Sequence, residues 1–160
     1  MAATSTLSPD SIHGGPAIAT LSGIFKNDGD KSCIDRGDIF RIDTGTTPPT
    51  FSFKGGTGAG NIAIAAEAVT LTHNQLKHSK DGGYLVHIPV VVFGRTMVNC
   101  KNGTTATYHG GDMAYIGSDF KVTGTAPTAN TGYRITFLHP DEIVNEKESP
   151  KEVFVEPYKV

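Results

Sequence analysis

The chain has 160 residues, which suits a single domain with short extensions and is enough to bury a core without disulfide staples. It carries 14 basic and 16 acidic residues and no cluster of lysine or arginine, so we expect no binding to nucleic acid or to an anionic membrane. Glycine and threonine supply 19 residues each, tryptophan is absent, and only 38% of the residues are hydrophobic. This composition predicts an all-β or β-dominated fold and argues against a helical bundle.

The longest apolar run covers six residues, 88–93, which is far too short to span a bilayer, and no apolar segment follows Met1 as in a secretory signal. Cys33 and Cys100 are too few for a disulfide framework, so we expect two reduced thiols. Together these features predict a chain that is made, and stays reduced, in a cytoplasm.

Residues 1–16 read MAATSTLSPDSIHGGP, and Leu7 and Ile12 are their only large aliphatic side chains after Met1. The segment shows neither the alternation of a strand nor the periodicity of an amphipathic helix. By itself it cannot bury enough apolar area to offset the entropy that ordering would cost. We therefore expect an N-terminal arm that is mobile in the isolated chain.

Strand signals follow at short intervals from Ala17 onward. We expect strands at residues 17–26, 38–43, 50–54, 61–72, 84–94, 95–101, 104–109, 119–123 and 133–138. Alanine and glutamate in 61–72 would also suit a helix, but valine, isoleucine and threonine there favour a strand. Pro89 confines its strand to an edge or bulge position, and Asn102-Gly103 predicts a hairpin between the strands that flank it.

The composition changes after residue 138, because nine of the 22 residues at 139–160 are charged. Pro140 and Asp141 could open a short helix, and residues 152–156 are typical of a last strand. We therefore divide the chain into a flexible arm at 1–16, a β-rich domain at 17–138 and a charged C-terminal extension at 139–160.

No pattern of reactive side chains predicts catalysis. The glycine run at 55–60 lacks the Gly-Lys-Ser/Thr ending of a phosphate loop, and no serine lies in a G-x-S-x-G motif. His73 and His78 are five residues apart, which suits no common metal pair, and His109 and Asp112 have no third ligand near them in sequence. We expect no enzyme, no cofactor, no metal and no small-molecule substrate.

Residues 38–93 resemble the head decoration proteins of lambda-like tailed bacteriophages. The resemblance is carried by Asp43-Thr44 closing a strand, TFSFK at 50–54, GGTGAG at 55–60, IAIAAEA at 62–68, TLT at 70–72 and KDGGYLV at 80–86. In that family a strand, an Asp-Thr turn, a second strand, a Gly/Thr-rich loop and an aliphatic-Ala-Ala-acid segment follow one another in a similar order.

The resemblance implies a compact sandwich- or barrel-like domain of the β-tulip kind. Such proteins form trimeric knobs on the outside of an expanded icosahedral capsid, where they clamp the major capsid protein against the pressure of packaged DNA. Their N-terminal arm docks on the capsid, and the corresponding contacts here are Leu7, Ile12 and Pro16. Such an arm can add as an extended strand to a sheet edge of its partner. Residues 139–160 have no counterpart in the family.

We therefore predict a capsid cement protein of the virion surface, a homotrimer that acts by binding, because weak contacts repeated by symmetry add up. The alternative is a carbohydrate-binding β-sandwich or a tail-fibre-type adhesion module. That alternative would need exposed aromatic side chains around a groove, and the chain has no tryptophan and five tyrosines. A small β-barrel enzyme is a third class, for which the sequence provides no catalytic group.

Overall fold

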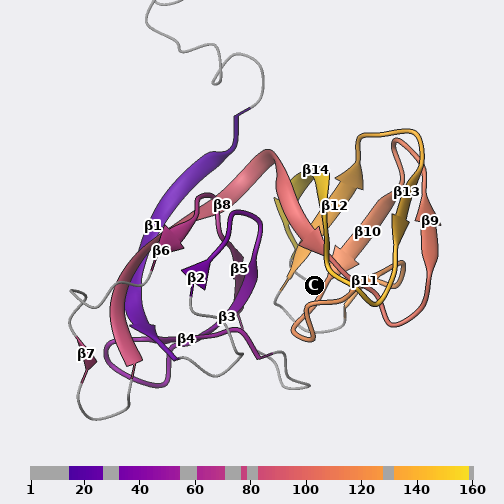
Figure 1. Cartoon of the computed structure of the whole chain (residues 1–160). Coiled ribbons are helices and arrows are strands. Elements are labelled where there is room, and N and C mark those ends of the chain that lie inside the picture. Colours follow the sequence, from indigo (N-terminus) through magenta and orange to yellow (C-terminus); the bar gives the residue numbers. More distant parts are fainter. Residues whose placement is uncertain are drawn as a thin grey trace, which may run out of the picture.

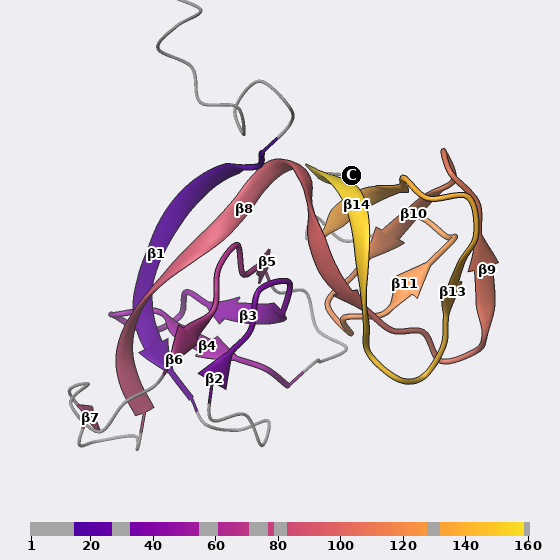
Figure 2. The ribbon, with the colours of Figure 1, turned by 45° about the horizontal axis from the view of Figure 1, so that its top comes forward.

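The computed structural model describes residues 15–26, 33–54, 61–70, 77–78, 83–127 and 132–158. All regular elements in these ranges are strands, so the predicted all-β fold is confirmed. Accordingly, no membrane-spanning helix occurs within these ranges. Figures 1 and 2 show two curved lobes that are joined by one long strand, β8.

Ten strands share one sheet in the order β11-β10-β12-β14-β8-β1-β4-β3-β5, with β7 paired to β8 beside this path. Two further pairs, β9 with β13 and β2 with β6, lie outside it. The strands are β1 (Ala17–Phe25), β2 (Cys33–Ile34), β3 (Ile39–Asp43), β4 (Thr50–Ser52), β5 (Asn61–Ile64), β6 (Val69–Thr70), β7 (Lys77–His78), β8 (Gly83–Cys100), β9 (Ala106–Tyr108), β10 (Met113–Ile116), β11 (Val122–Thr123), β12 (Tyr133–Phe137), β13 (Glu142–Val144) and β14 (Ser149–Pro157).

The first lobe is a small barrel built from β1, β3, β4, β5 and the first half of β8. Strand β1 runs antiparallel to β8 and parallel to β4, and β3 lies antiparallel between β4 and β5. A bridge between Ala65 and Val90 joins the end of β5 back to β8 and closes the ring. Large side chains fill the interior, among them Phe40 and Phe51, whose rings meet edge to face with centroids 5.3 Å apart.

The second lobe consists of β10, β11, β12, β14 and the second half of β8. The β9–β13 pair packs against it through the buried Val144 and the half-buried Tyr108, whose ring stacks on Phe137 with centroids 4.4 Å apart. The same apolar cluster continues into the first lobe through Ile64 and Val91. The core of the second lobe therefore reaches the first lobe, whose aromatic interior around Phe40 and Phe51 forms a separate cluster.

Strand β8 passes from one lobe to the other at Gly94. Its residues up to Phe93 pair with β1, and its residues from Gly94 onward pair with β14. Gly94 has a φ of +119°, which L-residues rarely adopt, and a Cβ atom there would lie 3.0 Å from the Cα atom of Pro16. Glycine thus permits both the bend of the strand and the close approach of Pro16.

The predicted hairpin at Asn102-Gly103 is wrong. Strand β8 pairs with β14 and β9 pairs with β13, so the turn carries the chain from one sheet to another. The Asn102 side chain caps the turn by accepting a hydrogen bond from the Gly103 N–H at 2.8 Å, and the Asn102 N–H donates to Asn145 O at 2.7 Å. Each of the two flanking strands thus pairs with a strand from later in the chain.

The C-terminal residues 139–160 also differ from expectation. No helix opens at Pro140, because β13 begins at Glu142. Strand β14 lies inside the sheet between β12 and β8, with Val153 and Val155 fully buried. Several of its charged side chains, such as Asp141 and Glu148, are exposed, whereas Glu142 and Lys151 are largely buried and form an ion pair at 2.8 Å. The segment therefore completes the second lobe rather than extending it.

Candidate interaction surface

One edge of β1 is open along its first half. The N–H groups of Ile24 and Lys26 donate to Pro49 O and Phe51 O of the β4 region, at 2.8 and 2.9 Å. Because the N–H groups of alternate residues point to the same side of a strand, those of Ile18, Thr20 and Ser22 point to this side as well. No described strand pairs with β1 there, since its pairing with β4 covers only Ile24 and Phe25.

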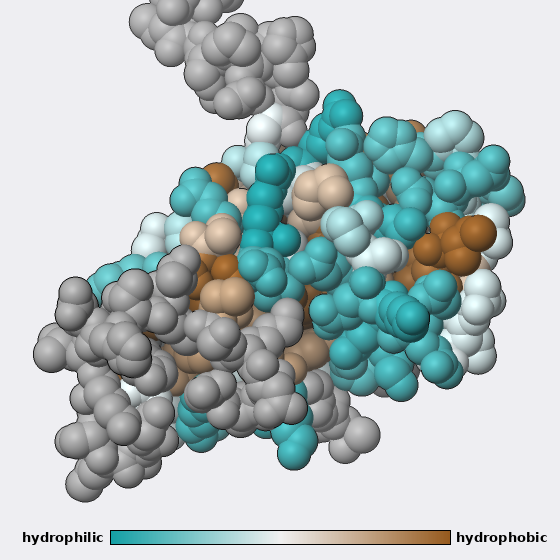
Figure 3. All heavy atoms as spheres, viewed as in Figure 1, coloured by the Kyte–Doolittle hydropathy of each residue, from teal (hydrophilic) through white to brown (hydrophobic). Residues whose placement is uncertain are grey.

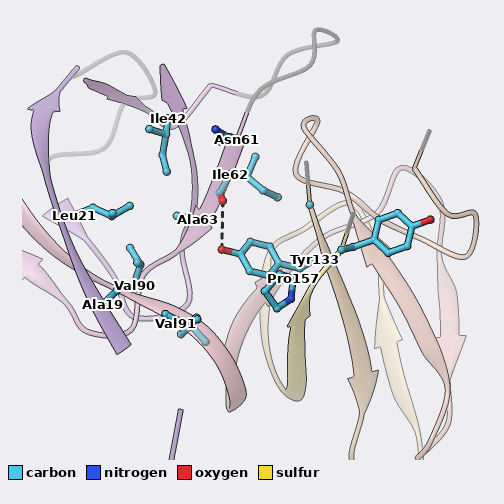
Figure 4. Close-up of a pocket in the computed structure, with 13 residues that line it drawn as sticks. Ala19, Leu21, Ile42, Asn61, Ile62, Ala63, Val90, Val91, Tyr133 and Pro157 are labelled. Carbon is cyan, nitrogen blue, oxygen red and sulfur yellow. Dashed lines mark hydrogen bonds between the residues drawn. The ribbon is translucent and has the colours of Figure 1, made fainter. Parts of the chain in front are cut away.

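An apolar cavity of about 380 Å³ lies beside this edge, at the mouth of the first lobe. Leu21 and Ile42 face it from β1 and β3, and Tyr133 reaches it from the second lobe (Figure 4). The full lining is Ala19, Leu21, Ile42, Asn61, Ile62, Ala63, Val90, Val91, Val92, Gly132, Tyr133, Pro157 and Tyr158. None of these side chains carries a charge, so the cavity suits an uncharged, apolar occupant.

Exposed apolar side chains surround the start of β1. Ile18 is 48% exposed, and Val92 and Phe93 on the facing part of β8 are 40% and 52% exposed. Ala17 pairs with Phe93 and Ile18 with Val91, and the register shifts between them. These three side chains, the open edge and the cavity together form what we call the β1 surface.

Tyr133 joins the two lobes next to the cavity. Its hydroxyl donates a hydrogen bond to Ile62 O at 3.3 Å, which Figure 4 shows as a dashed line. Burial raises the pKa of Tyr133 to about 12, so the phenol is neutral at physiological pH. The neutral phenol therefore donates a hydrogen bond that links β12 to β5.

A second polar group lies at the far end of the second lobe. The Nδ1 atom of His109 is 2.9 Å from Asp141 Oδ1 and 3.1 Å from Pro140 O, and the His109 N–H donates to Asp112 Oδ2 at 2.8 Å. The hydrogen bond to Asp141 is the main reason that the pKa of His109 is raised. These contacts tie the turn after β9 to the turn after β12, on the exposed surface.

The described residues contain no group of three or more His, Cys, Asp or Glu side chains that could hold a metal ion. Asp112 accepts a hydrogen bond from the backbone N–H of His109, whereas the imidazole of His109 contacts Asp141. His73 and the glycine run at 55–60 lie outside the described residues. Both cysteines are free, as expected, and burial raises the pKa of Cys100 to about 12.

The outer face of the second lobe is of mixed character. Met113 and Phe154 are exposed there, and the ion pairs Arg95–Glu152 and Arg134–Glu156 flank them. Figure 3 shows this lobe as mainly hydrophilic, with a hydrophobic area over β9 and β13, where Ile143 is 54% exposed. Charge and apolar area alternate on this face, in contrast to the uncharged β1 surface.

Of the three predicted contact residues, Leu7 and Ile12 lie outside the described residues, and Pro16 packs against the bend at Gly94. The open edge of β1 and the cavity were not predicted from the sequence. One signal was available, because β1 reads AIATLSGIF and contains neither a charge nor a proline, the usual devices that protect an edge strand.

Comparison with protein-family models, with curated proteins and with solved structures finds no match to this chain.

Proposed function

We propose that this chain is a structural virion protein that binds the outside of an expanded phage capsid. It would contact the major capsid protein as a homotrimer and stabilise the expanded head. The β-rich fold and the order of residues in 38–93, which resembles the head decoration proteins, support this proposal. The polar contacts described above, of Tyr133 with Ile62 O and of His109 with Asp141, each join two segments of the chain, which fits a protein that acts by binding.

The observation that carries the proposal is the β1 surface. It combines an open strand edge, exposed Ile18 and Phe93, and an uncharged cavity, all at the place where residues 1–14 join the fold. Open edges and exposed apolar groups are the two features that proteins use to add a strand from a partner. A decoration protein needs such a contact only in modest strength, because the capsid repeats it many times.

Co-sedimentation with undecorated, DNA-free expanded capsids of tailed phages tests the proposal. The chain should pellet with capsids, and Ile18→Asp should reduce the bound amount because it places a charge on the β1 surface. Ile143→Asp is the matched control, since Ile143 is equally exposed but lies on β13. Equal binding of both variants, or binding to no capsid, would contradict the proposal. Native mass measurement should give three times 16.9 kDa for a trimer.

The N-terminal residues are the second expected contact. Deletion of residues 2–14 should weaken capsid binding, because Leu7 and Ile12 would be lost as anchors. Pro16 is kept in this variant, since it packs at Gly94. Undiminished decoration by the shortened chain would show that the capsid contact lies in the folded domain alone.

A carbohydrate-binding or adhesion module is the alternative. It draws on Tyr158, which lines the cavity, and on Tyr115, whose ring meets that of Tyr158 with centroids 5.1 Å apart. Aromatic faces beside a groove suit sugar rings. A glycan array separates the two functions, because a decoration protein should bind no glycan, whereas an adhesion module should lose its binding in Tyr158→Ala.

A further inference from the structure

The β1 surface sets three requirements for whatever occupies it. The open N–H and C=O groups of Ile18, Thr20 and Ser22 call for an extended polypeptide, because only a strand can match their spacing. The cavity beside them has a volume of about 380 Å³, which admits a few side chains but not a second sheet. Its lining is uncharged, so a segment that carries charge toward the cavity is excluded.

We propose that the occupant is the N-terminal segment of the same chain, which adds along β1 as an antiparallel strand with Leu7 in the cavity. Residues 1–14 precede the fold directly at this edge, and residues 2–9 contain no charged side chain. They therefore meet the requirement of the lining. Leu7 is the one large aliphatic residue among residues 2–9, and the opening beside β1 holds only a few side chains.

Pro9 determines which side chains point into the cavity. Because proline has no N–H, it is tolerated in an added strand only where its nitrogen faces away from β1. The N–H groups of the even-numbered residues in the added strand must then face β1. In an antiparallel pair, Ser8 would form hydrogen bonds with Thr20, and Asp10 with Ile18. Odd-numbered residues consequently share the face of Ala19 and Leu21, which line the cavity. Leu7 thus points in, and the charge of Asp10 points out.

The length of the connection fixes the register. Placing Leu7 opposite Leu21 puts Ser11 opposite Ala17 and leaves residues 12–16 as the loop. Loops of this length are common in hairpins, and Gly14-Gly15 supplies the backbone freedom to reverse the chain. So short a tether gives a high effective concentration, which favours attachment to the same copy over attachment to a neighbour.

This inference goes beyond the proposed function, since it concerns the free protein. It replaces the expectation of an arm that is mobile in the isolated chain, because the edge of β1 and the cavity supply the partners that the segment lacks by itself. The segment expected to reach the capsid would rest on its own edge strand and cover it, as natural proteins do with edges that would otherwise pair at random. Capsid binding would then be an exchange, in which the segment leaves β1 for the partner.

Disulfide trapping tests the register in the full-length chain. With Cys33 replaced by serine, the pair Leu7→Cys and Leu21→Cys should oxidise readily, because directly opposite residues at a non-hydrogen-bonded site approach closely enough for a disulfide. The control pair, Leu7→Cys with Thr20→Cys, places the two thiols on opposite faces and should oxidise many times more slowly. The product should have the mass of a monomer. A linked dimer, equal rates for the two pairs, or no link at all would overturn the proposal.

Amide hydrogen exchange provides a test without cysteines. In full-length Leu7→Ser the amides of Ile18, Thr20 and Ser22 should exchange several times faster than in the original chain, because the strand that covers them loses its anchor. Those of Leu21 and Gly23, which face β8, should not change. Ile12→Ser is the matched control and should have the smaller effect, because Ile12 lies in the connecting loop. An equal effect would contradict the placement of Leu7 in the cavity. Neither experiment uses a capsid, so its outcome is independent of the proposed function.

Discussion

The side-chain amide of Asn99 donates a hydrogen bond to Asp38 Oδ1 at 2.7 Å, across 61 residues of sequence. Asp38 is 2% exposed, and its other carboxylate oxygen accepts the Asp35 N–H at 2.9 Å. Backbone hydrogen bonds flank this contact, from Gly37 N–H to Ala65 O and from Asn99 N–H to Gly37 O. The turn before β3 thus binds the end of β5 and the second half of β8, and it secures the junction of the two lobes.

Replacing Asp38 by alanine should destabilise the fold strongly. The change removes the acceptor of the Asn99 amide and of the Asp35 N–H at a buried site, and we expect a loss of about 2 to 3 kcal/mol in the free energy of unfolding. Asp35→Ala in the same turn is the control, because the Asp35 side chain is exposed and should cost less than about 0.5 kcal/mol. Urea unfolding of both variants measures the difference, and equal midpoints would contradict the assignment.

Gly94→Ala should be more costly than Gly111→Ala. Both glycines have positive φ, +119° and +92°, so both substitutions strain the backbone. A Cβ atom at Gly94 would also meet the Cα atom of Pro16 at 3.0 Å, whereas nothing lies within 4 Å of one at Gly111. We expect about 1 kcal/mol for the backbone strain in each case and a further loss only at Gly94. Thermal unfolding of the two variants would separate these effects; a larger loss at Gly111 would be inconsistent with the bend described for β8.

The fold class followed from composition because threonine and short alternating runs favour strands, and glycine supplies the turns between them. Alternation also located most strands, including 61–64, where alanine and glutamate left a helix open. Pairing could not be predicted in the same way. Asn102-Gly103 is a sound turn by local chemistry, but whether its flanking strands pair depends on β13 and β14, which lie far along the chain.

The candidate site was less predictable than the fold. The edge of β1 is open because no described strand pairs with its residues 17–23 on that side. Strand β4 begins only at Thr50, which lies opposite Ile24. The cavity depends on the approach of Tyr133 from the other lobe, 71 residues from Ile62. No local pattern encodes either relation. Only the lack of charge in β1 was visible in the sequence.

The two thiols should differ in reactivity. Cys100 is fully buried and its pKa is raised to about 12 by desolvation, so its reactive thiolate is scarce in the folded chain. Cys33 is partly exposed in β2. Alkylation of the unreduced native protein at pH 8 should label Cys33 alone, and alkylation in denaturant should label both. A peptide pair joined through sulfur, or rapid native labelling of Cys100, would contradict the structure.

Titration of His109 should depend on Asp141. The hydrogen bond from the protonated ring to Asp141 is the largest cause of the raised pKa of His109, and the charge of Asp112 is the smallest. Asp141→Asn should therefore lower the pKa of His109, measured from its ring proton resonances, more than Asp112→Asn does.

The same contact makes the stability of the chain depend on pH. Because the pKa of His109 is raised on folding, the contact stabilises the folded chain at pH values below the unfolded pKa near 6.5. This contribution disappears as the pH rises through the folded pKa. The loops at Pro140 and His109 should then exchange amide protons faster at high pH than at low pH after correction for intrinsic rates. If Asp112→Asn had the greater effect, the imidazole would be bound to Asp112 and not to Asp141.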